Sequence, residues 1–347
     1  MSSISESGNH EIHLAASKDN FHNKIDKKYK LHFINFKSSN TNPFVEFNLL
    51  IKFFSLIKKV KPDVILSFTI KPNIYGGIVA NFLKVPIINN ISGLGTVFIN
   101  QNLTTFIVKF LYKFSFSNYN FIFFQNQYDF ELFKKNNLLK ISKYDIIPGS
   151  GINTEKWKNK DFDKNKGKRI LLCARLIKDK GVNEYLNAAK ILKKKYKDLS
   201  FNLVGQIGVD NKTSIKKDLL NEFISKGIVN YLGESNDMKK TIKDHDICVL
   251  PSYREGMSRF LLESASMCKP IITTNVPGCK EIVNNFVNGF LCNVADIDDL
   301  VVKIDTMINL SEKERIEFGL NGRKLVEDFF EEDIVIQKYI NEIKNFK

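Results

Sequence analysis

The sequence predicts an α/β protein built from two successive doubly wound domains. Short apolar runs of strand length alternate with longer stretches of helical periodicity, which is the pattern of a parallel sheet with helices on both faces. The alternation stops at a charged stretch, residues 160–168, and then starts again. A length of 347 residues also suits two domains of about 150 residues each.

The first domain is expected over residues 1–150, with strands at 11–17, 29–36, 62–69, 85–92 and 121–126 and helices at 43–60, 74–84, 103–117 and 127–137. The second is expected over residues 151–328, with strands at 169–175, 199–205, 228–235, 247–252, 270–275 and 289–293. A last helix, within residues 329–347, is expected to pack back toward the first domain. Two such domains are expected to face a cleft, with ligands at the carboxyl ends of the strands.

Charge and composition restrict the class of protein. The net charge is +14, and residues 1–150 contribute +9 of it through 18 lysines and 9 acidic residues. This excess suits a nucleic acid, an anionic lipid or a phosphorylated substrate, but a lysine-rich composition can also lack any function. The start of the chain is polar and no uncharged apolar run reaches about 18 residues, so we expect no signal peptide and no transmembrane helix. The five cysteines include no CxxC pair, which favours reduced core thiols in a cytosolic protein.

Two segments of the second half carry candidate site residues. Arg175 ends a predicted strand and Lys180 follows before a helix, where cations and the helix N-terminus both attract phosphate oxygens. The alternative is a solvated basic loop. In residues 251–270, Glu255 precedes a predicted helix and Glu263 lies about one turn into it. The N–H groups before that helix, at Gly256, Met257 and Ser258, can receive a diphosphate.

The second half resembles the family 4 retaining glycosyltransferases of the GT-B fold. The resemblance rests on ARLIKDKGVNEYLNAAK (174–190), LVGQIG (203–208), VNYLGESNDM (229–238) and the long stretch 250–292, which contains EGMSRFLLE and PGCKEIV. These motifs occur in the family's order and spacing. The resemblance implies an enzyme, a hexosyltransferase, that uses a UDP-sugar as donor substrate.

Residue by residue, the resemblance implies a donor site. Arg175 and Lys180 would hold the donor diphosphate, Glu263 would bind the ribose and Glu255 would lie beside the donor sugar. Around them we expect further donor contacts from Gly205, Tyr231, Leu232, Gly233, Gly256, Met257 and Ser258. Glu255, Arg175 and Lys180 are the predicted catalytic residues. Because such enzymes rely on front-face displacement, positioning and charge stabilisation replace a covalent nucleophile. We expect no metal and no cofactor, since the Asp161–Asp163 and Asp244–Asp246 strings lie in a loop and before a buried strand.

The first half resembles a narrower group, the bacterial enzymes that build surface polysaccharides, such as lipopolysaccharide or capsule, on undecaprenyl diphosphate. TIKPNIYGG (69–77) and VPIINNISGLGTVF (85–98) carry this resemblance. It implies an N-acetylhexosamine transferred to a lipid-linked saccharide acceptor, with Lys71, Asn73, Gly93 and Gly95 on the acceptor side. Helices 44–61 and 103–117 carry Phe and Leu with interspersed Lys, a pattern that either packs in a core or lies on an anionic bilayer. The resemblance therefore predicts a cytoplasmic protein, peripheral on the cytoplasmic face of the inner membrane.

The beginning of the chain departs from the family pattern. The strand at 11–17 resembles the family's second strand, so we expect the first strand–loop–helix unit to be absent from the first domain. Alternatives to a transferase are a GT-B nucleotide-sugar epimerase or phosphorylase, a non-catalytic truncated homologue, and a basic nucleic-acid-binding protein. The EGMSRFLLE segment disfavours the epimerase, and no stacking-aromatic or helix-turn-helix signature supports nucleic acid as a partner.

Overall fold

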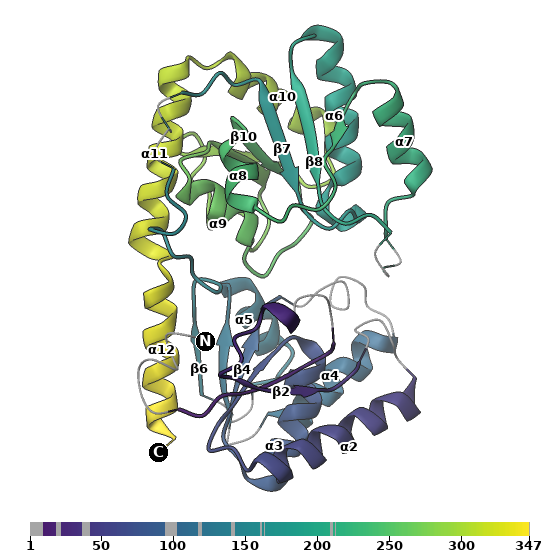
Figure 1. Ribbon diagram of the computed structural model, residues 1–347, viewed down its shortest axis with the longest axis vertical. Helices are drawn as coiled ribbons and strands as arrows, with labels where there is room; N and C mark the ends of the chain where they lie inside the picture. Colours follow the sequence, from purple (N-terminus) through teal and green to yellow (C-terminus); the bar gives the residue numbers. More distant parts are fainter. Residues whose placement is uncertain are drawn as a thin grey trace. The chain divides into compact units, whose positions relative to one another are not determined.

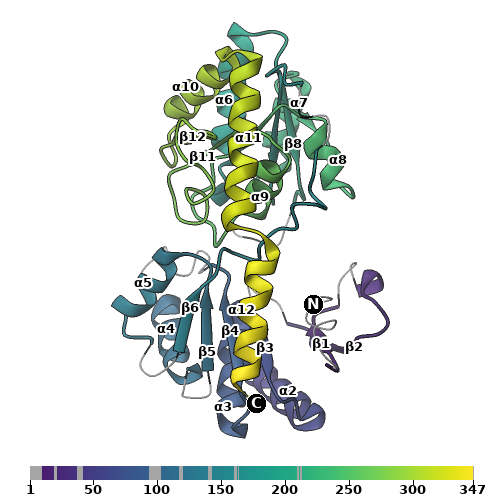
Figure 2. The same ribbon diagram turned by 90° about the vertical axis from the view of Figure 1, so that its left-hand side faces the viewer.

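The protein is described from a computed structural model, shown in Figures 1 and 2. The structure describes residues 10–18, 22–36, 42–93, 103–116, 120–139, 143–159, 162, 164–208, 211 and 213–346. The chain forms two compact units: unit 1 contains residues 1–147 and 335–347, and unit 2 contains residues 148–334. Both are α/β units with parallel sheets, as the alternating pattern predicts.

Unit 1 is built on a four-stranded parallel sheet. Its order follows the sequence: β3 (Ile65–Phe68), β4 (Ile87–Ile91), β5 (Asn120–Phe124) and β6 (Lys143–Ile146). A separate parallel pair is formed by β1 (His13–Ala16) and β2 (Lys30–Phe33), joined by the short helix η1 (His22–Lys24). Strand β6 is not predicted from the sequence, because an edge strand that is half exposed lacks the apolar run of a buried strand.

Helices cover both faces of the unit 1 sheet. On one face lie η2 (Pro72–Gly76), α3 (Gly77–Leu83), α4 (Leu103–Ser115) and α5 (Gln127–Lys135), which share a core with Ile122 and Phe124 of β5. The alternate residues of β5, Phe121 and Phe123, meet α12 (Glu332–Asn345) on the other face. Figure 2 shows α12 lying across that face. Helix α2 (Pro43–Val60) packs against α3 through a smaller apolar cluster.

Unit 2 contains a six-stranded parallel sheet in the order β12-β11-β10-β7-β8-β9. The strands are β7 (Arg169–Cys173), β8 (Ser200–Val204), β9 (Asn230–Tyr231), β10 (Ile247–Leu250), β11 (Ile271–Thr274) and β12 (Gly289–Cys292). One face carries α6 (Val182–Lys195), α7 (Lys217–Ser225) and α10 (Ile297–Asn309). The other carries α8 (Met238–Lys243), α9 (Arg259–Ser266) and α11 (Glu312–Phe329). The predicted doubly wound arrangement is confirmed.

The order of the strands in unit 2 creates a switch point. The chain runs outward from β7 through β8 to β9, and then returns to place β10 on the other side of β7. In an open parallel sheet, the loops after the two strands at such a point diverge and leave a ligand-binding crevice at their carboxyl ends. The loop after β7 contains Arg175 and Lys180, and the loop after β10 contains Glu255.

Candidate active site

A close backbone contact joins the two loops at the switch point. The loop after β7 ends in a short 3₁₀ helix, η4 (Lys178–Lys180), and then in Gly181, whose φ of +69° starts α6. A Cβ atom at Gly181 would lie 2.0 Å from the carbonyl oxygen of Pro251, in the loop after β10. Only glycine permits both this conformation and this approach. The contact places Lys180 beside the Glu255 loop.

Lys180 and Glu255 form an ion pair at this contact. The Lys180 Nζ atom lies 2.5 Å from Glu255 Oε1, and each side chain is only 15% exposed. An ammonium group has three N–H donors, so the pair leaves donors of Lys180 for another anion. The structure thus brings together two of the three residues that the sequence analysis places in catalysis.

Further hydrogen bonds fix the loop after β10. The Tyr253 N–H and the Ser252 hydroxyl both donate to the Asp179 carbonyl oxygen, at 2.8 and 3.1 Å. The Tyr253 hydroxyl donates to Glu184 of α6 at 2.7 Å. Burial and this neighbouring carboxylate raise the pKa of Tyr253 above its ordinary range, so the phenol stays a donor. Tyr253 and Glu184 are not predicted from the sequence, because their contact depends on how the two loops pack.

Gly278, in the segment after β11, allows a close backbone contact with Glu255. The Glu255 N–H donates to the Pro277 carbonyl oxygen at 3.1 Å. Gly278 has a φ of +79°, and a Cβ there would lie 2.5 Å from the Glu255 carbonyl oxygen. The PGCKEIV motif therefore packs against the backbone of the Glu255 loop and fixes its position.

Ser258 caps the helix that carries Glu263. Its side chain accepts a hydrogen bond from the Leu261 N–H at the start of α9, and its own N–H donates to the Gly278 carbonyl oxygen at 2.9 Å. The Ser258 N–H thus has a backbone partner in this structure, and its predicted contact with a diphosphate stays a prediction. The same holds for the predicted contacts of Gly256 and Met257.

Glu263 is held by a residue that the sequence analysis did not single out. Its carboxylate is buried and lies 2.9 Å from the Arg259 Nε atom, one helical turn earlier. Burial raises the pKa of Glu263 above its ordinary value, while the Arg259 guanidinium opposes the rise. The spacing of the two residues, i and i+4 on a helix, is a signal that the sequence does contain.

The loops after β7, β8 and β9 meet at one corner of the sheet. A Cβ at Gly205 would lie 1.7 Å from the Ala174 carbonyl oxygen, and the Gly205 N–H donates to Gly233 at 2.8 Å. The Tyr231 hydroxyl donates to the Gly205 carbonyl oxygen at 2.9 Å. Gly205 is thus needed for close packing of the loops.

Two further residues predicted for the donor site lie at this corner of the sheet. Arg175 follows Ala174, whose carbonyl oxygen approaches Gly205, and the Arg175 side chain is exposed. Leu232 is half exposed and its N–H continues the sheet ladder to Leu203. Both are therefore open to a ligand through their side chains.

The residues predicted for the acceptor side lie in unit 1. Lys71 pairs with Glu46 at 2.6 Å. Asn73 is 1% exposed, and its side chain bonds Ser67 and the Asn90 carbonyl oxygen at 2.6 and 2.8 Å. Asn73 thus holds the η2 segment against β4, and its place on the acceptor side stays a prediction. Gly93 has a φ of +106°, and Gly95 lies outside the described residues.

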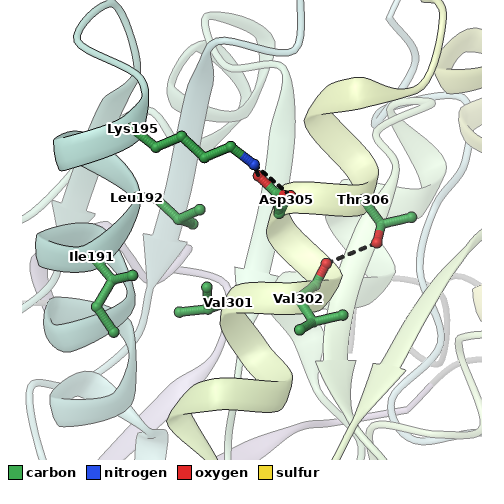
Figure 3. Close-up of a pocket in the computed structure, with 7 residues that line it drawn as sticks. All are labelled: Ile191, Leu192, Lys195, Val301, Val302, Asp305 and Thr306. Carbon is green, nitrogen blue, oxygen red and sulfur yellow. Dashed lines mark hydrogen bonds and ion pairs between the residues drawn. The ribbon is translucent and has the colours of Figure 1, made fainter.

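Clusters of metal-ligating side chains and a hollow in unit 2 are the other features that could form a site. Within the described residues, no three His, Cys, Asp or Glu side chains gather closely enough to hold a metal ion. Figure 3 shows a hollow between α6 and α10 that the Lys195–Asp305 ion pair crosses at 3.1 Å. Its α6 residues lie at the carboxyl end of that helix, away from the loops that contain Lys180 and Glu255. The hollow is therefore no part of the candidate active site.

The fold and the site together define a class of protein. Two units with parallel sheets, one of which presents basic and acidic side chains at a switch point, are typical of enzymes that bind a nucleotide diphosphate. The glycosyl transferases group 1 family model matches residues 153–325, and a glycosyl transferase 4-like model matches residues 3–126. The chain belongs to the group 1, or family 4, glycosyltransferases and is a glycosyltransferase.

Similar proteins extend this assignment over the whole chain. The N,N'-diacetylbacillosaminyl-diphospho-undecaprenol alpha-1,3-N-acetylgalactosaminyltransferase of Campylobacter jejuni is 31% identical over 95% of this chain and 90% of its own. The UDP-Gal:alpha-D-GlcNAc-diphosphoundecaprenol alpha-1,3-galactosyltransferase of Escherichia coli is 25% identical over 91% of this chain and 86% of its own.

Solved structures show the same fold. Sucrose-phosphate synthase from Thermosynechococcus elongatus superposes with a TM-score of 0.81 at 15% identity, over 99% of this chain and 90% of that one. Anabaena HepE in complex with UDP superposes with a TM-score of 0.79 at 16% identity, over 99% and 94% of the two chains. The predicted GT-B fold is confirmed.

Proposed function

We propose that the chain transfers an N-acetylhexosamine from a UDP-sugar to a saccharide linked to polyprenyl diphosphate, with retention of the anomeric configuration. The Lys180–Glu255 pair at the switch point of unit 2 carries the proposal, because it joins a phosphate-binding cation to a carboxylate that can contact a sugar. The named relatives from C. jejuni and E. coli, which act on undecaprenol-diphosphate sugars, support this acceptor class. The C. jejuni relative transfers N-acetylgalactosamine, which makes UDP-N-acetylgalactosamine the first donor to test.

The donor would be held by residues of the three loops described above. Lys180 keeps N–H donors for the diphosphate while it bonds Glu255, and Arg175 is exposed beside the same corner of the sheet. Glu263, paired with Arg259, would accept hydrogen bonds from the ribose hydroxyls. Leu232 and the backbone near Tyr231 and Gly233 would line the base, since they end the outermost strand of the sheet.

The chemical step would need no covalent intermediate with the protein. The acceptor hydroxyl forms a bond to the anomeric carbon as the bond from that carbon to the β-phosphate oxygen breaks, on the same face. The hydroxyl proton passes to the departing phosphate oxygen, and UDP leaves. Lys180 and Arg175 would stabilise the negative charge that develops on this oxygen, which is the largest contribution a preorganised site can make. Because these cations supply that charge, we expect neither a metal nor a cofactor.

The reaction would take place at the cytoplasmic face of the inner membrane. A polyprenyl diphosphate keeps its acceptor saccharide at a bilayer surface, so the enzyme must work there. None of the described helices is long and apolar enough to cross a membrane. We therefore propose peripheral attachment and a role in the assembly of cell-surface polysaccharide.

The test is transfer from a panel of donors. The protein would be incubated with UDP-N-acetylgalactosamine, UDP-N-acetylglucosamine, UDP-galactose and UDP-glucose, each with a polyprenyl-diphosphate-linked monosaccharide, in the presence of EDTA. We expect one N-acetylhexosamine to be transferred, and Glu255→Ala to abolish transfer. Glu222→Ala is a matched control, because Glu222 forms an exposed pair with Lys226 on α7. Failure of all four donors, together with no binding of UDP, would refute the proposal.

A further inference from the structure

Helix α4 carries apolar side chains on the face opposite its buried side. Thr105, Tyr112 and Ser115 lie on its buried face. Its other face presents a stripe of exposed apolar side chains, spaced by three or four residues, in which Phe106 is 69% exposed: Leu103, Phe106, Ile107, Phe110 and Phe114. Residues at this spacing lie above one another along a helix. Single exposed apolar residues are ordinary, but a continuous stripe of five is typical of an interaction surface.

The neighbouring helices extend this surface. Phe82 of α3 is 76% exposed, and its ring contacts Phe54 of α2 at 6.0 Å between centroids. Phe44, Phe47 and Ile51 of α2 are exposed on the outer side of that helix, opposite its buried residues. Helix α3 contacts both α2 and α4, and Figure 1 shows the three helices together on one side of unit 1. We call the exposed faces of α2, α3 and α4 the apolar helix face.

The segment that forms the apolar helix face has an excess of positive charge. Residues 42–116 contain only two acidic residues, Glu46 and Asp63, against eight lysines: Lys52, Lys58, Lys59, Lys61, Lys71, Lys84, Lys109 and Lys113. Lys71 and Glu46 form a largely buried pair that adds no net charge at the surface, which leaves the other seven lysines against Asp63. On α4, Lys109 and Lys113 lie along one flank of the Phe106–Phe110–Phe114 stripe, where their aliphatic stems can follow the apolar side chains.

We propose that the apolar helix face docks on an anionic lipid bilayer, with α4 lying in the plane of the interface. An apolar stripe flanked by lysines matches such a surface: the rings enter the boundary between headgroups and acyl chains, and the ammonium groups meet the lipid phosphates. A second protein would have to present a similarly extended acidic surface. The proposal extends the proposed function, because it names the part of unit 1 that would hold the enzyme at the membrane where a lipid-linked acceptor resides.

The test is flotation of the purified protein with lipid vesicles. Vesicles of equal parts phosphatidylglycerol and phosphatidylcholine would be compared with phosphatidylcholine alone, without nucleotide-sugar or acceptor. We expect the wild type to float with the anionic vesicles. A triple variant, Phe106→Ser, Phe110→Ser and Phe114→Ser, should bind at least about 100-fold more weakly, because each buried ring contributes about tenfold. Phe329→Ser is the matched control, since Phe329 is equally exposed on α11 of unit 2.

A second variant separates charge from apolar contact. Lys52→Gln, Lys59→Gln and Lys113→Gln together should weaken binding to the anionic vesicles by about 100-fold, since each lysine near such a surface contributes roughly fivefold. The same change at the exposed Lys217, Lys239 and Lys313 of unit 2 should have little effect. Circular dichroism would confirm that both triple variants are folded.

Three results would overturn the proposal. One is that the wild type does not float with the anionic vesicles. Another is that the Phe-to-Ser triple variant floats as well as the wild type. The third is self-association of the wild type in sedimentation that the same Phe-to-Ser changes abolish, which would assign the face to a second copy of the chain. Because no donor is present, the outcome is independent of transferase activity. Transfer to a short-chain, water-soluble acceptor should be unchanged in both triple variants, so failure of the proposed function would be seen separately.

Discussion

The ion pair between Lys180 and Glu255 leads to a double-mutant prediction. Two unit charges 2.5 Å apart attract each other by about 7 kcal/mol at an effective dielectric constant of about 20, before desolvation is subtracted. Removing one partner of a buried pair leaves an uncompensated charge and costs about 3–5 kcal/mol. Since each side chain keeps 15% exposure, we expect Lys180→Met to lower the free energy of unfolding by about 2–3 kcal/mol. Glu255→Gln in the same chain should restore part of this loss.

The assay is urea unfolding of the single variants and the double variant, with UDP binding measured by calorimetry in parallel. Lys180→Met should also weaken UDP binding by about 10-fold to 100-fold, through the loss of a charge-assisted hydrogen bond. The matched control is Lys226→Met, because the Lys226–Glu222 pair has the same 2.5 Å separation but side chains that are 57% and 54% exposed. That exposed pair should contribute no more than about 0.5 kcal/mol. Equal losses for the two lysines, or additive effects of Lys180→Met and Glu255→Gln, would refute the reasoning.

Three further predictions concern neighbouring contacts. Arg259→Gln should weaken UDP binding by about 10-fold, with a larger loss as pH falls, because Glu263 then protonates more easily. Calorimetry across pH would show no such dependence in an Arg259→Gln, Glu263→Gln double variant. Gly278→Ala should reduce transfer strongly, since its Cβ would lie 2.5 Å from the Glu255 carbonyl oxygen, and a normal reaction rate would contradict this role. Arg169 and two backbone N–H groups outweigh burial and lower the pKa of Asp246, so this carboxylate stabilises the fold above its ordinary pKa. That stability is lost as pH falls through the lowered value, and unfolding of Asp246→Asn should show a smaller loss on acidification than the wild type.

Much of the fold was predictable because local patterns specify it. The strand period repeats strongly in unit 2, and each predicted strand there overlaps an observed one, although the strand predicted at 228–235 is only Asn230–Tyr231 in the structure. Strand β6 was not predicted, because a half-exposed edge strand lacks the run of apolar residues that marks a buried strand. Helices 44–61 and 103–117 carry a pattern that suits either packing in a core or lying on a bilayer. Both uses require apolar residues at helical spacing, so the sequence could not separate them.

In the candidate site, too, some residues could be predicted from the sequence, whereas the contacts between them could not. Arg175, Lys180, Glu255 and Glu263 could be named from sequence, because they lie in short continuous motifs that resemble those of the family. Which of them touch could not be predicted, since the Lys180–Glu255 pair spans 75 residues of sequence. The bond from the Ser258 N–H to the Gly278 carbonyl oxygen could not be predicted either, because it joins two loop segments that are separated along the chain.

The sequence by itself thus determined two doubly wound units, a glycosyltransferase family and the residue types of the donor site. Only the tertiary structure decided that β10 lies beside β7, which brings Lys180 to Glu255, and that the Phe106 stripe of α4 faces outward. The physical reason is the range of the forces involved. Periodicity and helix caps act over a few residues, whereas strand order and side-chain partners depend on packing between segments far apart in the chain.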